Sequence, residues 1–374
     1  GDNNTAVGFN CLDANTTGGS NTAVGSSALS ANVDGAGNTA LGMNTLLANT
    51  SGSNSTAVGY EALGANTTGA SNVAVGVQAL DANTTGASNT AVGSGSLGAN
   101  TTGANNTAVG TTSLDANTTG TQNNAFGVNS LTTNTTGSYN AAFGVNALAA
   151  NTTAGSNSAF GSSTLAANTT GDNNTAVGFN CLDANTTGAS NTAVGSSALS
   201  ANTNGSDNTA VGKFSLTSNT TGVGNTAVGK GAGTSMTTAV SNTCIGTAAG
   251  SGLTTGGENV CVGNRAGVGF TTGAQNNIMG DNACSTGTIT GGNNVVIGDN
   301  SAYAATGAFA SNTIIGGNNS NAITTGTNNL FLGNGAGNSG SPGGSITTES
   351  HNIILGDENI TNAHIQVDWT VASD

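Results

Sequence analysis

The stretch NTAVGSSALSANVDGAG, residues 21–37, is one unit of a repeat that fills nearly the whole chain. Its fifth residue, Gly25, follows an apolar residue, and such a glycine recurs every 17 residues from Gly8 to Gly280. The spacing then becomes 18, 18, 17 and 23 residues and carries the pattern to Gly356. A fixed period of this length over 21 units is typical of a solenoid, in which each unit forms one turn.

The composition separates this chain from ordinary globular proteins. Only 5% of its residues are charged and 3% are aromatic, with 61 Gly and one Pro, whereas charged residues make up about a quarter of a typical domain. Chains rich in Gly, Asn, Ser and Thr often remain disordered, which is the competing prediction. The unbroken apolar register favours a folded solenoid instead. No apolar run approaches the ~18 to 20 residues of a membrane span, so we expect no membrane insertion.

The charge of the chain excludes one large class of partner. The formal net charge is -14, and the only strong bases are Lys213, Lys230 and Arg265. A nucleic-acid-binding surface needs clustered positive charge, so we expect no nucleic-acid partner. The acidic balance instead favours solubility of a long, weakly charged rod. Residues 1–8 already belong to the repeat, and we therefore expect the chain to be part of a longer protein.

Two apolar positions in each unit define the expected core. The residue before the glycine is apolar in all 21 units, as in Val7 and Val24. Four residues after the glycine, the first 13 units have Leu, as in Leu12 and Leu29. β-Branched Val and Thr beside a small Ala favour a strand. Strand alternation places Thr and Val on one face and Ala on the other. We expect Val and Leu to form the buried seam, and Ala to face a symmetry axis between neighbouring chains.

A column of Asn is the most regular polar feature. Asn stands four residues before the glycine in 20 of the 21 units, with Ser55 as the exception. Identical residues stack in a parallel solenoid, so we expect a structural ladder of amide hydrogen bonds along this column. Its expected members include Asn4, Asn21, Asn38, Asn72, Asn89 and Asn106. A second column runs from Asn15 to Asn219 in Asn-Thr-Thr-Gly units, which predict tight turns.

The repeat changes along the chain and predicts three parts. Residues 1–228 form a regular rod of 17-residue repeats, and residues 229–356 form a less regular solenoid with larger apolar residues in the Ala column. Residues 357–374 form a capping strand and its junction. Residues 1–18 and 171–188 are identical, which indicates duplication of ten turns. Twenty steps of about 4.8 Å predict a rod of about 100 Å.

These motifs resemble two families. Asn-Thr-Ala-Val-Gly, with the forms NVVIG, NTIIG and NIILG near the end, resembles the head repeats of trimeric autotransporter adhesins, which implies a left-handed β-roll of three interlocked chains. The longer pattern NTAVGxxALxANTTG, ending in HIQVDWTVASD, is similar to phage tail-fibre and related virion fibre proteins. In that family a self-cleaving, endosialidase-type intramolecular chaperone begins at a Ser-Asp pair. The resemblance implies that Ser373 and Asp374 are this cleavage junction and that the chaperone itself is absent from the chain.

No constellation of residues predicts catalysis, a cofactor or a metal. His351 and His364 lack a repeated acidic partner. One column of acidic residues is interrupted by Ser and Gly, which does not favour calcium. Its members are Asp13, Asp81, Asp115 and Asp183. We therefore expect no enzymatic activity, no cofactor and no metal site.

Cysteine and threonine leave minor alternatives open. Cys11 and Cys181 share one position in the unit, and Cys244 and Cys261 replace Ala in adjacent units. We interpret them as small apolar fillers, with a Cys244–Cys261 disulfide as the alternative. The Thr column suggests ice binding, which we set aside because Thr shares a face with the Val expected to be buried. Asn-x-Thr sequons suggest glycans, but turn chemistry explains them.

These observations predict an all-β, parallel β-solenoid (a left-handed β-roll or β-helix) of 17-residue turns, assembled as an interlocked homotrimer. We expect it to be the shaft or distal rod of an extracellular phage or virus-like tail fibre that presents a host-recognition end. Its expected partners are its own copies, other fibre or virion proteins, and a host surface receptor or glycan. The alternative is a trimeric adhesin head on a bacterial surface that binds host matrix or glycans.

Overall fold

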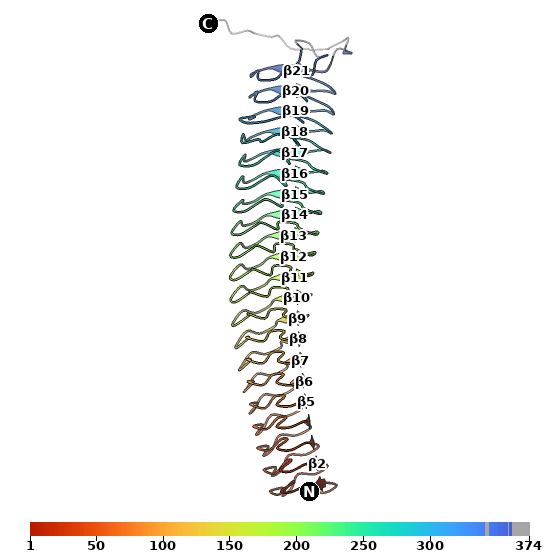
Figure 1. Ribbon diagram of the computed structural model, residues 1–374, viewed down its shortest axis with the longest axis vertical. Helices are drawn as coiled ribbons and strands as arrows, with labels where there is room; N and C mark the ends of the chain where they lie inside the picture. The colour runs from red at the N-terminus through yellow and green to blue at the C-terminus, as the bar shows by residue number, and fades with distance from the viewer. Residues whose placement is uncertain (341–343, 358, 361–374) are drawn as a thin grey trace. The chain divides into compact units, whose positions relative to one another are not determined.

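The computed structural model describes residues 1–340, 344–357, 359 and 360. These residues contain 21 strands of three residues each and no helix. They belong to two compact units, residues 1–238 and the described part of residues 239–374. Within each unit the strands follow one another in chain order as successive turns (Figure 1). The prediction of an all-β parallel solenoid is confirmed.

The first unit holds fourteen strands, one in each turn. Thirteen steps of about 4.8 Å make this unit about 60 Å long. The strands are β1 (Thr5–Val7), β2 (Thr22–Val24), β3 (Thr39–Leu41), β4 (Thr56–Val58), β5 (Val73–Val75), β6 (Thr90–Val92), β7 (Thr107–Val109), β8 (Asn124–Phe126), β9 (Ala141–Phe143), β10 (Ser158–Phe160), β11 (Thr175–Val177), β12 (Thr192–Val194), β13 (Thr209–Val211) and β14 (Thr226–Val228).

The second unit holds seven strands in its described residues. They are β15 (Thr243–Ile245), β16 (Val260–Val262), β17 (Asn277–Met279), β18 (Val295–Ile297), β19 (Thr313–Ile315), β20 (Leu330–Leu332) and β21 (Ile353–Leu355). Successive strands pair in parallel at steps of 17, 17, 18, 18, 17 and 23 residues. These are the spacings that the glycines predict.

Hydrogen bonds join neighbouring turns around their whole circumference. Ala23 lies opposite Ala40 in the parallel pair of β2 and β3. Away from the strands, the Leu80 N–H donates to the Ser96 carbonyl at 3.0 Å. At the next corner, the Thr84 N–H donates to the Thr101 carbonyl at 2.9 Å. Each turn therefore satisfies the backbone of its neighbours, although only three of its residues form a strand.

The buried face of the strand is the opposite of the expected one. Each strand has three residues, so only the central one points into the turn, and Ala23 is fully buried. Val7 is 58% exposed and Val24 is half-buried, so the predicted Val seam is wrong. Leu29 is fully buried as predicted, and Leu12 in the first turn is half-buried. Ala faces the core of its own chain and not a symmetry axis.

Glycine and leucine shape the corner that follows each strand. A Cβ at Gly76, whose φ is +140°, would lie 2.5 Å from the carbonyl oxygen of Gly93 in the next turn. Only glycine therefore permits the spacing of turns at this position. Four residues later Leu80 has a φ of 55°, a conformation that bulky residues usually avoid. Its complete burial against the Ala column offsets this cost.

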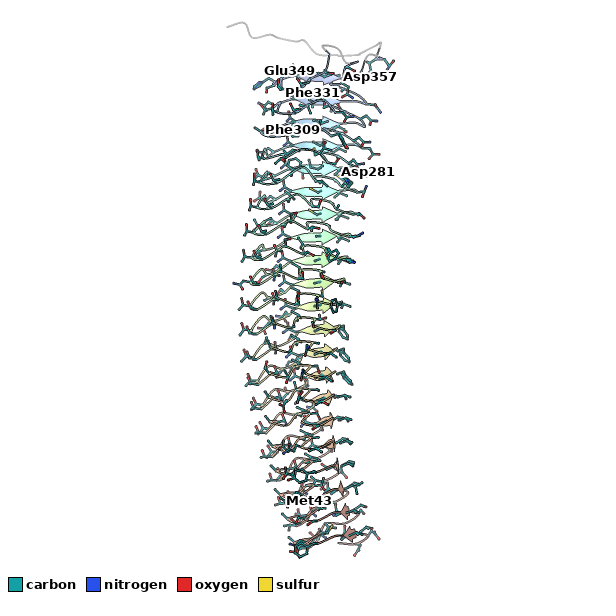
Figure 2. The ribbon with its side chains drawn as sticks, viewed as in Figure 1. Met43, Asp281, Phe309, Phe331, Glu349 and Asp357 are labelled. Atoms are coloured by element: carbon teal, nitrogen blue, oxygen red, sulfur yellow. The ribbon has the colours of Figure 1, made fainter. Side chains whose placement is uncertain are left out.

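In some turns of the second unit the larger core residue lies at the centre of the strand, and the position of Leu is taken by glycine. Cys244 replaces Ala at the centre of its strand, and Gly250 replaces Leu. A Cβ at Gly250 would lie 2.4 Å from the Cys244 Sγ, so the larger central residue requires the glycine. Phe331 occupies the space beside Gly337 in the same way. Phe331 and Phe309 are fully buried inside their turns (Figure 2).

The assignment of inward residues can be tested in the first unit. We expect Ala108→Leu to lower the free energy of unfolding by about 1–3 kcal/mol through overpacking, and Leu114→Ala to lower it by about 2–5 kcal/mol through a cavity. The exposed Thr119→Ala should stay within about 0.5 kcal/mol. Urea unfolding followed by circular dichroism measures all three. Tolerance of leucine at position 108 would contradict the observed orientation of the strand.

Candidate interaction surface

The first Asn column forms a ladder from side chain to backbone. The Asn38 N–H donates to the Asn21 Oδ1 at 2.9 Å, and the Asn38 Nδ2 donates to the Gly52 carbonyl at 2.8 Å. Ser55 continues the ladder, because its N–H donates to Asn38 Oδ1 at 3.0 Å and its hydroxyl accepts from the Asn72 N–H at 3.2 Å. The same bonds join the other predicted members, which are Asn4, Asn21, Asn89 and Asn106.

The second Asn column forms a direct ladder of amide groups. Twelve hydrogen bonds of 2.8–3.0 Å run from each Nδ2 to the Oδ1 of the preceding turn, from Asn15 to Asn219. Each of these amides, such as Asn32, also donates to the carbonyl three residues later. The sequence predicted only a tight turn here. In the next turn Met236 takes the place of Asn, and the buried Asn219 Oδ1 has no partner.

Within each unit, the outward face of the strands is a surface without charge. Its two columns, the residues before and after the central strand residue, contain no Asp, Glu, Lys or Arg in the described strands. We call these residues the strand face. Val75, Val92 and Val194 are each 37% exposed there, and Leu41 is 48% exposed. The reason for setting ice binding aside fails, because Thr and Val both lie at the surface.

Three aromatic residues interrupt the uniform strand face. Phe126, Phe143 and Phe160 follow one another in the Val column of β8, β9 and β10. Their ring centroids are 4.8 Å apart, and successive rings are within 7° of parallel. Phe160 remains 42% exposed. The stack distinguishes these three turns from the rest of the strand face.

The predicted acidic column lies outside the strands, where Asp81, Asp115 and Asp183 are partly buried and Asp13 is exposed. A Cβ at Gly98 would lie 2.8 Å from the Asp115 Oδ1 and 3.5 Å from the Asp81 Oδ1. Both carboxylates therefore lie close to Gly98, which is in the turn between theirs. Burial raises the pKa of both carboxyl groups. Burial also raises the pKa of Asp183, whose Oδ1 is buried without a partner. Within residues 1–340, 344–357, 359 and 360, no group of three or more His, Cys, Asp or Glu could hold a metal.

One pair of carboxylates, in which Asp81 of this column has Glu61 as its neighbour, was not predicted from the sequence. Glu61 and Asp81 line an open hollow of about 250 Å³, together with Asn44, Leu47, Gly64 and Ala65. Hydrogen bonds from Tyr60 and Gln78 lower the pKa of Glu61, and the bond from Gln78 Nε2 is 3.1 Å long. The pair was missed because its members occupy different positions of adjacent turns. Among the described residues, no other turn repeats the pair.

The cysteines are free thiols. Cys244 and Cys261 lie opposite each other in β15 and β16, but they form no disulfide. A hydrogen bond with Cys244 and burial raise the pKa of Cys261. Burial raises the pKa of Cys181 to about 12, which makes its thiol a poor nucleophile. His351 is exposed, whereas His364, Ser373 and Asp374 lie outside the described residues.

Comparison with known proteins assigns no family. No family model matches the chain, and no curated protein matches it. In the described part of the chain, no helix is long and apolar enough to cross a membrane. The repeat, the ladders and the strand face are therefore the features of the chain that bear on its function.

The amide ladder can be tested by removing one donor. We expect Asn117→Asp to lower the free energy of unfolding by about 1–3 kcal/mol. The substitution replaces the Nδ2 donor by a carboxylate oxygen, which then faces the Asn100 Oδ1 as a second buried acceptor. The matched control is Asn105→Asp, an exposed position of the same turn, with a change of about 0.5 kcal/mol or less. Thermal unfolding measures both variants. Equal effects at the two sites would exclude a structural role for the ladder.

The acidic column predicts a pH dependence. The folded state raises the pKa of Asp115, so this carboxyl favours folding when it is protonated, and that contribution is lost as the pH rises through its folded pKa. Asp115→Asn should therefore raise the melting temperature at pH 7 and have no effect near pH 3. The gain should be less than about 1 kcal/mol, because the carboxyl is only partly buried and solvent screens its charge. Asp34→Asn, at an exposed corner, should change the melting temperature little at pH 7. A lower melting temperature for Asp115→Asn at pH 7 would contradict the prediction.

Proposed function

We propose that the chain is a non-enzymatic, homotrimeric shaft or distal rod of an extracellular phage or virus-like tail fibre. The strand face is the observation that carries this proposal. It presents exposed Val, Leu, Ile, Met and Phe in successive turns and carries no charge, in a protein whose net charge is -14. Long apolar surfaces of this kind usually mark contacts between proteins.

A second copy of the same chain fits the strand face by its period. Its turns repeat at the same strand spacing, so apolar side chains of two copies can stay aligned over many turns. Because the surface is common to all copies, a closed assembly around an axis can bury it in every chain at once. The central Ala residues are buried within their own turns. The strand face, and not the Ala column, is therefore the surface that we propose to face the axis between neighbouring chains.

The turns suit a mechanical role. In the first unit each strand contacts only the strands before and after it, so the unit can be lengthened by whole turns without a new core. The backbone and amide ladders run along the stacking direction and oppose separation of turns. These features support a spacer that holds a host-recognition end, other fibre proteins or a receptor contact away from a particle.

Light scattering on the purified chain tests the proposal. We expect a mass three times the chain mass of 35.4 kDa. The double variant Val92→Lys and Val109→Lys should dissociate, because it places like charges on the strand face of adjacent turns. The matched control is Thr102→Lys with Thr119→Lys, which adds the same charge at exposed corners.

Two outcomes would overturn a homotrimer that assembles through the strand face. The first is a monomeric parent chain, which would leave the exposed Thr and Val array for a different ligand, such as ice or a glycan. The second is a trimer that survives the strand-face variant. A trimer that dissociates equally with the corner variant would mean that net charge, and not the strand face, controls assembly.

A further inference from the structure

Three successive corners of the first unit depart from the repeat. After β2, the positions one, two and five residues beyond the glycine hold Ser26, Ser27 and Ser30. After β3, β4 and β5, larger polar or apolar side chains occupy these positions, among them Asn44, Leu47, Tyr60, Glu61, Gln78 and Asp81. The exception is Gly64, which stands between Leu47 and Asp81 in its column. These corners therefore have a chemistry of their own.

Gly64 leaves open the hollow that these side chains surround. A Cβ at Gly64 would have three backbone atoms as its nearest neighbours, the first of which is the Glu61 carbonyl oxygen at 3.2 Å. At Gly98, the next glycine of the column, the nearest neighbour would instead be a side-chain atom, the Asp115 Oδ1 at 2.8 Å. Side chains therefore fill the space at Gly98 but leave it open at Gly64, which lines the hollow of about 250 Å³.

The lining of the hollow combines apolar and polar groups. Leu47, which is 37% exposed, and Ala65 supply the apolar part. Glu61 and Asp81 supply carboxylates, which only accept hydrogen bonds when they are ionised. A ligand that suits this lining therefore carries several hydrogen-bond donors next to an apolar surface.

Neighbouring side chains hold Glu61 in place without a ligand. The Gln78 Nε2 donates to the Glu61 Oε2 at 3.1 Å, and Tyr60 forms a hydrogen bond with the same carboxylate. Tyr60 is 41% exposed, so its ring is accessible beside the hollow. A carboxylate that is already fixed loses less side-chain freedom on binding than a mobile one does.

A single hexopyranose ring has the required chemistry. Its hydroxyl groups are hydrogen-bond donors, and its C–H groups form an apolar face that can pack against aromatic and aliphatic side chains. The hollow is smaller than the ~300 Å³ at which pockets for drug-sized ligands begin, which suits one ring. Among the described residues, no Lys, Arg or His lines the hollow. Its two carboxylates would therefore repel an acidic sugar.

We propose that this hollow binds one neutral hexopyranose ring of a glycan. Hydroxyl groups of the ring donate to the Glu61 and Asp81 carboxylates, its C–H face lies against Leu47, and the Tyr60 ring extends this contact. The inference rests on the proposed function only for the extracellular source of the glycan, because a single chain forms the whole hollow. In a homotrimer, three equal sites would raise the avidity for a surface that displays many such rings.

Saturation-transfer NMR on the full chain tests binding directly. The probes are the methyl glycosides of glucose, galactose and mannose, and we expect at least one to bind with a dissociation constant on the order of 1 mM. The acidic control is N-acetylneuraminic acid, which should not bind. Failure of all three glycosides would overturn the proposal, and so would binding of n-butylammonium in their place, which would assign the hollow to amines.

The variant Gly64→Leu tests the position of the site by filling the hollow. The backbone at Gly64 lies outside the left-handed region, and the same column already contains Leu47, so we expect the variant to fold and to lose glycoside binding. The control Ala166→Leu adds a leucine to the same column in another turn and should bind as the parent chain does. Undiminished binding by Gly64→Leu would place the glycoside elsewhere and contradict the proposal.

The variant Glu61→Gln tests the hydrogen bonds while keeping the shape of the side chain. It should weaken binding about tenfold or more, because an acceptor atom becomes a donor. The control Asp115→Asn removes a carboxylate from the column of Asp81 but outside the hollow, so binding should not change. Equal losses in the two variants would mean that net charge, and not the hollow, controls binding.

Light scattering on the same samples separates this proposal from the homotrimer. A monomer that binds the glycoside would overturn only the homotrimer. A trimer that binds no glycoside would overturn only the saccharide site.

Discussion

Stacking of each residue on its own equivalent in the next turn is the constraint on which this structure depends. It aligns Ala on Ala and Asn on Asn at one strand spacing. A contact or hydrogen bond made by one residue is therefore repeated in every turn of its column. An amide that would be costly to bury alone becomes satisfied on both sides when its neighbour is the same amide. The invariant glycine, exemplified by Gly76 beneath the Gly93 carbonyl, keeps the turns close enough for this stacking.

The same constraint explains how the core can change its chemistry without changing its register. Across the second column, the amide ladder ends at Asn219, and Met236 takes the next position. The Asn219 Oδ1 is left without a partner, which is the local cost of ending a ladder. In the second unit the larger Cys244 at the centre of the strand is matched by Gly250 at the position of Leu, because a Cβ there would lie 2.4 Å from the Cys244 Sγ.

The sequence predicted the period, the parallel register and the columns, because all three follow from spacing alone. It failed at the sidedness of the strand. Val24 is larger and more apolar than Ala23, and hydrophobicity therefore favoured Val as the core residue. The interior of a 17-residue turn is so narrow that Ala fits beside Leu29, and the larger Val must lie outside. The amide ladder through Asn32 was also missed, since a turn motif already explained those residues. The available signal was an Asn repeated in 13 successive turns, from Asn15 to Asn219, three residues after a Leu.

A uniform repeat does not define a single alignment of two strand faces, but residues that depart from the repeat can define one. Two identical strand faces could align in many positions, each displaced by one turn, with nearly equal burial of Val. The stack of Phe126, Phe143 and Phe160 breaks this equivalence, because large rings fit a facing copy in fewer positions than Val does. In the proposed homotrimer, the repeat supplies the surface for assembly, and the three aromatic turns supply the information that selects one alignment. On this argument, the residues that depart from the repeat carry more specificity than those that conform to it.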